Sequence, residues 1–243
     1  MRKDQRAPGE MRPVRFEPGI QKFSTGSVLV SFGDTRVICA ANIEEKVPGW
    51  LSGRGQGWLT AEYSMLPGST QQRHPRDSGR GGVNGRAQEI QRLIGRSLRA
   101  ITDLKILGER TLAIDCDVLQ ADGGTRTAAI TGAYVAAQFA LRKLIQAGTL
   151  KASPLREAVA AVSVGMIKGE VCVDLNYGED STADVDLNLV MTASQKLVEV
   201  QGTAEGAPFA RHDLTAMLDA GQAALAKLFE LQEKALHESA VVY

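Results

Sequence analysis

The spacing of apolar residues changes from strand-like to helix-like, and this order occurs twice along the chain. Short apolar runs predict strands, and apolar residues at helical spacing predict helices. The first part predicts strands at 27–32, 36–43, 58–65 and 111–119, and helices at 84–101 and 128–145. The second part predicts strands at 160–167, 170–175, 185–191 and 196–201, then a helix from 213 to about 236. Each part begins with a hairpin and ends with a helix, so the pattern predicts two similar β/α halves.

Helical spacing stops at 148–154, where a turn-prone stretch with a proline begins. This stretch separates a first half at 10–147 from a second half at 155–237. A chain of 243 residues can bury one large core or two fused cores, so we expect a single domain over 1–243 that contains both halves. The expected fold class is α/β, or α+β, with mixed sheets packed against helices.

Composition excludes several classes of protein. No apolar run approaches the length needed to cross a bilayer, and the first residues lack the apolar stretch of a secretory leader, so we expect a cytoplasmic protein with no membrane partner. The three cysteines lie in separate strand-like runs and predict buried thiols: Cys39, Cys116 and Cys172. The three histidines are too scattered for a zinc site or a histidine-activated nucleophile.

Gly123, Gly124, Thr125 and Arg126 lie between a predicted strand and a predicted helix, where anions often bind. The glycines allow backbone N–H groups to approach a ligand, and Thr125 and Arg126 add a hydroxyl and a forked cation. The segment therefore suits a phosphate. A plain turn with a helix cap has the same composition.

Residues 73–99 carry seven arginines and two acids, a local charge of +5 in a chain whose formal net charge is zero. This imbalance favours a polyanionic partner. The preceding stretch, 68–82, is rich in glycine, serine and proline and predicts a long mobile loop. Its arginines Arg73, Arg76 and Arg80 fit either a nucleic-acid arm or a solvated loop.

Asn84 can cap the helix predicted at 84–101. Its apolar stripe consists of Ile90, Leu93, Ile94, Leu98 and Ile101. Arg92, Arg96 and Arg99 occupy the opposite face, which is either solvated or packed against a partner. Arg86 lies in the first turn near the edge of the stripe, so we expect it to be partly buried and to need an anion, either a carboxylate of the chain or a bound phosphate.

The turn at 179–186 gathers carboxylates before a predicted strand. Alternation along the strand places Asp184 and Asp186 on one face, and Asp180 can reach them from the turn. Carboxylate oxygens without histidine or thiolate suit Mg²⁺ or Mn²⁺. An acidic turn that keeps the strand end solvated is the alternative. Together with the glycine turn and the arginine segment, the cluster suggests phosphodiester chemistry on RNA with bound inorganic phosphate, although spacing does not decide between phosphate and water as the nucleophile.

Several runs of the chain resemble, in order, those of the bacterial ribonuclease PH family. They are RPV at 12–14, SFGDTRV at 31–37, GWLTAEYSMLP at 57–67, GRAQEIQRLIGRSLR at 85–99, DCDVLQADGGTRTA at 115–128, DLNYGEDS at 174–181, DVDLN at 184–188 and EVQGTAEG at 199–206. The resemblance spans nearly the whole chain. One departure is Gln5, which stands where the family often has glycine.

This resemblance implies a phosphate-dependent 3′-to-5′ exoribonuclease that trims transfer RNA precursors, and other RNAs such as ribosomal RNA, with release of nucleoside 5′-diphosphates. It implies the duplicated ribonuclease PH fold, which is like domain 2 of ribosomal protein S5, and a homohexamer formed as a trimer of dimers. By position, Arg86, Gly124, Thr125 and Arg126 match the residues that bind phosphate, the co-substrate. Asp180 and Asp186 match the carboxylates associated with catalysis and Mg²⁺ or Mn²⁺.

RNA contacts are expected from the arginines of the loop and of the basic helix face: Arg73, Arg76, Arg80, Arg92, Arg96 and Arg99. Two other functions stay open. The first is a metal-dependent ribonuclease in which water replaces phosphate. The second is an RNA-binding ring subunit without activity, but such a subunit would be expected to lack Arg86, Thr125, Arg126, Asp180 or Asp186, and all five are present.

Overall fold

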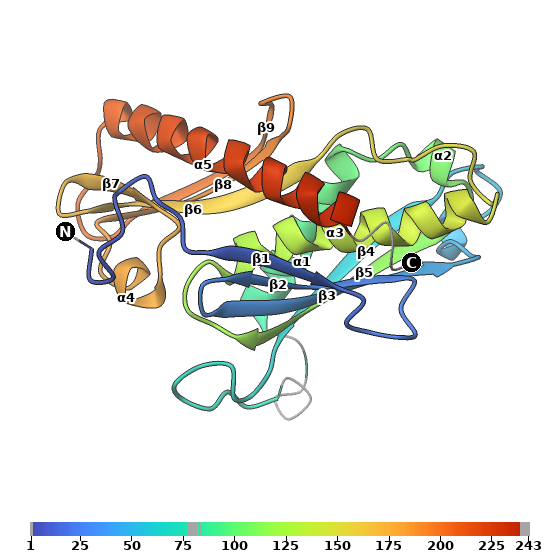
Figure 1. Cartoon of the computed structure of the whole chain (residues 1–243), viewed down its shortest axis with the longest axis horizontal. Coiled ribbons are helices and arrows are strands. Elements are labelled where there is room, and N and C mark those ends of the chain that lie inside the picture. The colour runs from blue at the N-terminus through green and yellow to red at the C-terminus, as the bar shows by residue number, and fades with distance from the viewer. Residues whose placement is uncertain (1, 77–81, 83, 239–243) are drawn as a thin grey trace.

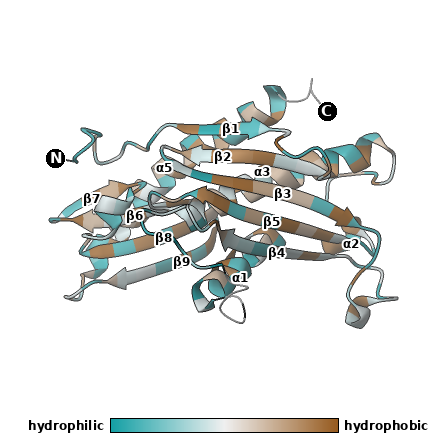
Figure 2. Ribbon diagram, turned by 90° about the horizontal axis from the view of Figure 1, so that it is seen from below, coloured by the Kyte–Doolittle hydropathy of each residue, from teal (hydrophilic) through white to brown (hydrophobic). Residues whose placement is uncertain are grey.

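The computed structural model of the chain describes residues 2–76, 82 and 84–238. A five-stranded sheet forms the first half, in the order β1-β2-β3-β5-β4. Its strands are β1 (Val14–Pro18), β2 (Gly26–Phe32), β3 (Thr35–Glu44), β4 (Trp58–Met65) and β5 (Thr111–Gln120). All neighbours are antiparallel except β4 and β5, and Figure 2 shows these strands side by side.

A four-stranded antiparallel sheet forms the second half, in the order β7-β6-β8-β9. Its strands are β6 (Val159–Ile167), β7 (Glu170–Val173), β8 (Val185–Thr192) and β9 (Leu197–Ala204). The mixed first sheet and the antiparallel second sheet, packed with helices, confirm the predicted fold class.

Helix α3 (Thr125–Gln146) joins the halves because it packs on β2 and β3 of one sheet and on β6 of the other. It is buried on nearly every side from Thr125 to Leu141 and is rich in alanine. Gly132 allows the close approach, since a Cβ there would lie 2.5 Å from Val30 Cγ1 and 2.8 Å from Cys39 Sγ. Helix α5 (Arg211–Glu238) covers β6 and β7, and its carboxyl-terminal end crosses in front of α3 in Figure 1.

Helix α1 (Gly85–Ala100) packs against β4. Its predicted stripe is confirmed, because all five apolar side chains are buried. The Asn84 side chain accepts a hydrogen bond from the N–H of Ala87 and so caps the helix as expected. The three cysteines are buried free thiols, also as expected.

Several element bounds differ from the expectation. Helix α3 begins at Thr125 and not at 128, because the left-handed Gly124 starts it directly. Strand β7 ends at Val173, since Asp174 has φ +52° and leaves the extended conformation. The short helices α2 (Leu104–Leu107) and α4 (Tyr177–Asp180), the 3₁₀ turn at Gly49–Leu51 and strand β1 were not predicted, because each is too short to show a period.

Candidate active site

The turn before α3 is held tightly between the two halves of the molecule. Gly123 and Gly124 have φ values of +74° and +64°, which favour glycine. A Cβ on Gly123 would lie 2.4 Å from the carbonyl oxygen of Leu175, so only glycine lets the turn pass this backbone. Thr35 Oγ1 donates to Gly123 O at 2.6 Å and accepts from the N–H of Asp122 at 2.9 Å. Among the described residues, no side-chain hydrogen bond caps α3 at Gly124, so the first N–H groups of the helix suit an anion.

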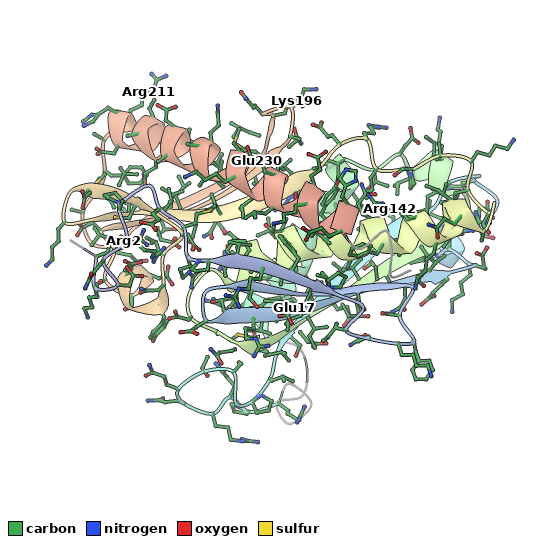
Figure 3. All side chains as sticks on the ribbon, in the orientation of Figure 1. Arg2, Glu17, Arg142, Lys196, Arg211 and Glu230 are labelled. Carbon is green, nitrogen blue, oxygen red and sulfur yellow. The ribbon has the colours of Figure 1, made fainter. Side chains whose placement is uncertain are left out.

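A buried charge network supports this turn from the amino-terminal side. Arg12 contacts Asp174 with Nε at 2.9 Å and Nη2 at 2.7 Å, and it also donates to the carbonyl oxygen of Asp122. Arg2 donates twice to Glu179, at 2.7 Å each, beside α4, where Figure 3 shows it. Gln5 lies in this segment with φ +67°, a conformation that favours glycine.

Thr125 is positioned by Tyr63 of β4. The Tyr63 hydroxyl and Thr125 Oγ1 are 2.8 Å apart, and both residues are buried. Burial raises the pKa of Tyr63, although the hydrogen bond with Thr125 and the charges of Arg86 and Arg126 partly offset it. Tyr63 is therefore a neutral hydroxyl at neutral pH. The sequence analysis missed it, although Tyr63 alternates with Leu59 and Ala61, and a tyrosine on the apolar face of a strand is a signal for such a contact.

Arg126 is largely buried, and its Nη1 donates to Gln201 Oε1 at 2.6 Å and lies 3.4 Å from Glu89 Oε1. Arg86 departs from the expectation, because it is exposed and not partly buried. Within the described chain, no carboxylate forms an ion pair with Arg86. Its charge nevertheless acts on Tyr63, Asp180 and Asp186.

The two carboxylates come from separate elements of the second half, Asp180 from the end of α4 and Asp186 from β8. Burial raises the pKa of Asp180, and Arg86, Arg126 and Arg12 partly offset this effect. Burial, and then the charge of Asp180, raise the pKa of Asp186 to about 6. The structure thus brings the predicted arginines and carboxylates into one electrostatic neighbourhood.

Asp186 also has an open position for a ligand. Among the described residues, its Oδ1 is buried without a hydrogen-bond partner, and its Oδ2 receives a long 3.5 Å contact from Asn188 Nδ2. The described residues hold no group of three or more histidine, cysteine, aspartate or glutamate side chains suited to a metal. Two carboxylates with an open oxygen still fit a hard divalent ion that takes its other ligands from water or substrate phosphates.

Asp184 lies directly before strand β8, which begins at Val185. It is exposed, and its Oδ2 accepts from the N–H of Lys168 in the β6–β7 turn at 3.0 Å. The expectation that it shares a face with Asp186 stays a prediction.

The expected RNA-binding arginines differ in their surroundings. Arg73, Arg76 and Arg92 are exposed, and Arg80 lies outside the described residues. Arg96 pairs with Glu199 of β9, and Arg99 lies 5.0 Å from the centre of the Trp58 ring and donates to Leu59 O. Their contact with RNA stays a prediction.

The start of the expected loop is anchored to the fold. Ser69 is buried, its N–H donates to Leu66 O at 2.9 Å, and its carbonyl oxygen accepts from the N–H of Ala121 at 2.8 Å. The N–H of His74 donates to Pro67 O at 2.8 Å. The mobility expected of the loop therefore does not extend to these anchored residues.

Comparison with known proteins identifies the family to which the chain is similar. Two sequence models of the 3′ exoribonuclease family match, domain 1 over residues 10–140 and domain 2 over residues 157–224. A ribonuclease PH from Moorella thermoacetica is 56% identical over 231 residues, which cover 95% of this chain and 92% of that protein. The resemblance stated from the sequence runs is confirmed.

Solved structures with a similar fold have much lower sequence identity. Rice (Oryza sativa) Rrp46 superposes with a TM-score of 0.80 at 20% identity, covering 97% of this chain and 100% of that chain. A chain of the Archaeoglobus fulgidus exosome with RNA bound to the active site gives a TM-score of 0.78 at 22% identity, covering 96% of this chain and 92% of that chain. These similarities show the fold.

Proposed function

The chain belongs to the 3′ exoribonuclease family, to which its ribonuclease PH relative also belongs, and on that premise we propose the residues that carry out its reaction. It is a phosphate-dependent 3′-to-5′ exoribonuclease, a nucleotidyltransferase that removes nucleotides from the 3′ ends of transfer RNA precursors. The observation that supports the assignment most is the electrostatic coupling of Arg86 and Arg126 with Asp180 and Asp186 beside the start of α3.

Inorganic phosphate binds to Arg86, Thr125, Arg126 and the backbone N–H groups that follow Gly124. One of its oxygens attacks the phosphorus of the last phosphodiester in line with the 3′ oxygen of the preceding nucleotide. The new P–O bond gives a nucleoside 5′-diphosphate, and the leaving 3′ oxygen takes a proton to end the shortened RNA in a hydroxyl. Positioning and charge neutralisation supply most of the acceleration in such a reaction.

Asp180 and Asp186 would hold Mg²⁺ or Mn²⁺ at the buried open oxygen of Asp186. Such an ion, when bound, neutralises charge on phosphate oxygens and on the leaving oxygen. Asp186 has a second possible role, because a carboxyl group whose pKa is raised to about 6 is protonated in part near neutral pH and can act as a general acid.

We also propose the wider context of the enzyme. The described residues contain no helix long and apolar enough to cross a membrane, which agrees with a cytoplasmic location without requiring one. A homohexamer built as a trimer of dimers would cover exposed apolar side chains such as Phe23, which is 93% exposed, and Trp50. The known structures with this fold include an archaeal exosome core. Single-strand contacts and 2′-hydroxyls would select RNA, including ribosomal RNA as a further substrate.

One experiment tests the reaction. A short RNA with a 3′ extension is incubated with the protein, with and without phosphate, and the released mononucleotides are identified. We expect nucleoside 5′-diphosphates that appear only when phosphate is present. Nucleoside monophosphates formed without phosphate would identify a hydrolytic ribonuclease, and RNA binding without any release would identify a subunit that lacks activity.

A further inference from the structure

Gln201 of β9 contacts the arginine assigned to phosphate, although neither its position nor its type suggests a part in the chemistry. Its Oε1 accepts from Arg126 Nη1 at 2.6 Å. Its Nε2 donates to Glu89 Oε1 at 3.0 Å, and the same Glu89 oxygen lies 3.4 Å from Arg126 Nη1. Three residues from three elements, α1, α3 and β9, thus form a closed triangle.

All of these contacts on Arg126 are made at one nitrogen. Nη1 carries two hydrogens, and Gln201 and Glu89 accept them. The opposite edge of the guanidinium, formed by Nε and Nη2, makes no hydrogen bond within the described chain. This edge has the geometry of a fork that binds two oxygens of a phosphate at once.

The triangle also fixes the direction of the Gln201 amide. An amide can turn over and present its NH₂ group in place of its oxygen, and an NH₂ group facing Arg126 would repel it. The Glu89 carboxylate prevents this, since it accepts from Nε2 and so keeps Oε1 directed at Arg126. Glu89 is one of only two acids in the arginine-rich segment 73–99, and its side chain is 44% exposed against 17% for Arg126.

We propose that Gln201 is a positioning residue for phosphate, held by Glu89, which fixes Arg126 at Nη1 and presents the Nε–Nη2 edge to the co-substrate. The inference rests on the proposed function, because it takes Arg126 as a phosphate ligand. Its consequence is specific to phosphate binding. Loss of the contact should weaken the affinity for phosphate more than it slows the enzyme once phosphate is saturating.

The chain offers a matched control two residues earlier on the same strand. Glu199 of β9 pairs with Arg96 of α1, so Glu199→Gln removes an ion pair between the same two elements, by removing its negative charge, without touching Arg126. Initial rates are measured on a short unstructured RNA at saturating concentration, with phosphate varied, to give KM for phosphate and kcat. Far-UV circular dichroism checks that each variant is folded.

For Gln201→Met, which keeps the length of the side chain but removes the acceptor, we expect KM for phosphate to rise roughly tenfold, the scale of one charge-assisted hydrogen bond. We expect kcat to change much less, and Glu199→Gln to leave KM unchanged. An unchanged KM in Gln201→Met, a loss confined to kcat, or an equal rise in Glu199→Gln would overturn the proposal.

Glu89 provides a second test that does not depend on the folding of Gln201→Met. Glu89→Ala frees the Gln201 amide and should raise KM for phosphate, whereas Glu89→Gln keeps an acceptor for Gln201 Nε2 and should not. If both substitutions lower KM, Glu89 acts only as a repelling charge and the positioning role is wrong. The same assay separates this outcome from failure of the proposed function, since the wild-type enzyme would then release nucleotides without phosphate.

Discussion

Two charge networks lie beside each other in this molecule and use the same residue types in opposite ways. In the amino-terminal network, Arg2 and Arg12 meet Glu179 and Asp174 at 2.7 Å, and all four side chains are almost completely buried. In the active-site network, Arg86 and Arg126 act on Asp180 and Asp186 through their charges but form no direct ion pair with them among the contacts of the described chain.

The difference is sharpest at two adjacent residues of α4. Burial alone would raise the pKa of Glu179, but hydrogen bonds from Arg2 and Asn176 and the charge of Arg6 outweigh it, so its pKa is lowered. Asp180 is the next residue, and its pKa is raised because burial outweighs the more distant arginines. A fully paired carboxylate stabilises the fold, whereas one left without a partner keeps its oxygens available for a ligand.

The largest expected effect is on the unpaired carboxylates. Asp180→Asn and Asp186→Asn should abolish turnover, because the neutral amide cannot hold a divalent ion or supply the acid, while RNA binding stays the same or improves as negative charge is lost. Turnover and RNA affinity are measured in parallel. Asp184→Asn is the control, since Asp184 is exposed and accepts from the N–H of Lys168. Equal losses at all three positions would mean that the acidic turn is only structural.

The same substitution at Asp186 should stabilise the protein. With a pKa raised from 3.8 to about 6, the ionised carboxylate opposes folding at pH 7. A shift of about two pKa units corresponds to about 2–3 kcal/mol. The contribution of Asp186 to stability is fully present below pH 4, where the group is protonated in both states, and it is lost as the pH rises through 6. Asp186→Asn should therefore gain stability over the wild type at pH 7, measured by urea unfolding with a chelator present, and no gain at that pH would show that the burial cost is small.

Breaking the paired network should cost stability more than chemistry. Arg12→Ala removes the closest cation from the buried Asp174 carboxylate and leaves it the longer 3.6 Å pair with Arg6, so the free energy of unfolding should fall by about 3 kcal/mol. Arg96→Ala serves as the comparison, because its partner Glu199 forms an exposed pair worth about 1 kcal/mol or less. Urea unfolding measures both. Similar losses in the two variants would contradict the distinction between the networks.

Removal of Arg86 or Arg126 should lower activity more than stability. Arg126→Ala and Arg86→Ala should fold normally, with kcat at saturating phosphate lowered by about 10²–10³. Arg126→Lys should also be impaired, since an ammonium group cannot bind two phosphate oxygens as a fork does. Near-normal turnover in either alanine variant would remove that arginine from the phosphate site.

What the sequence predicts correctly here depends on local signals. The stripe and cap of α1 are defined within one segment, and so are the two hairpins. The contacts that complete the site join distant positions: Arg12 and Asp174 are 162 residues apart, Arg126 and Gln201 are 75 apart, and Tyr63 and Thr125 are 62 apart. No period or spacing reports such pairs.

The expectation of a partly buried Arg86 failed for a related reason. A helical wheel gives the direction of a side chain relative to its own helix, but not which other element covers it. The start of α3 at Thr125, three residues before the expected start, could not be predicted from the sequence either. The left-handed conformation of Gly124 shows that the helix begins at the next residue, and the presence of a glycine alone does not show this.

The smallest expected effect concerns arginines that belong to neither network. Arg73 and Arg76 are exposed, and Arg80 follows in the same glycine-rich segment. Changing all three to alanine should raise KM for a folded transfer RNA precursor severalfold and flatten its dependence on salt, because fewer cations then contact the RNA backbone. Turnover of a short unstructured oligonucleotide should stay nearly the same, since it reaches the reacting groups without the loop.

The two substrates have to be measured side by side over several salt concentrations, because one KM value alone does not separate capture of the RNA from chemistry. Ser69 and the contacts of its backbone stay intact in this variant, so the anchored start of the loop is preserved. If the precursor and the oligonucleotide lose activity equally, the three arginines act at the reacting bond or between subunits. They would then belong with Arg86 and Arg126, and the loop would not be an element that only captures substrate.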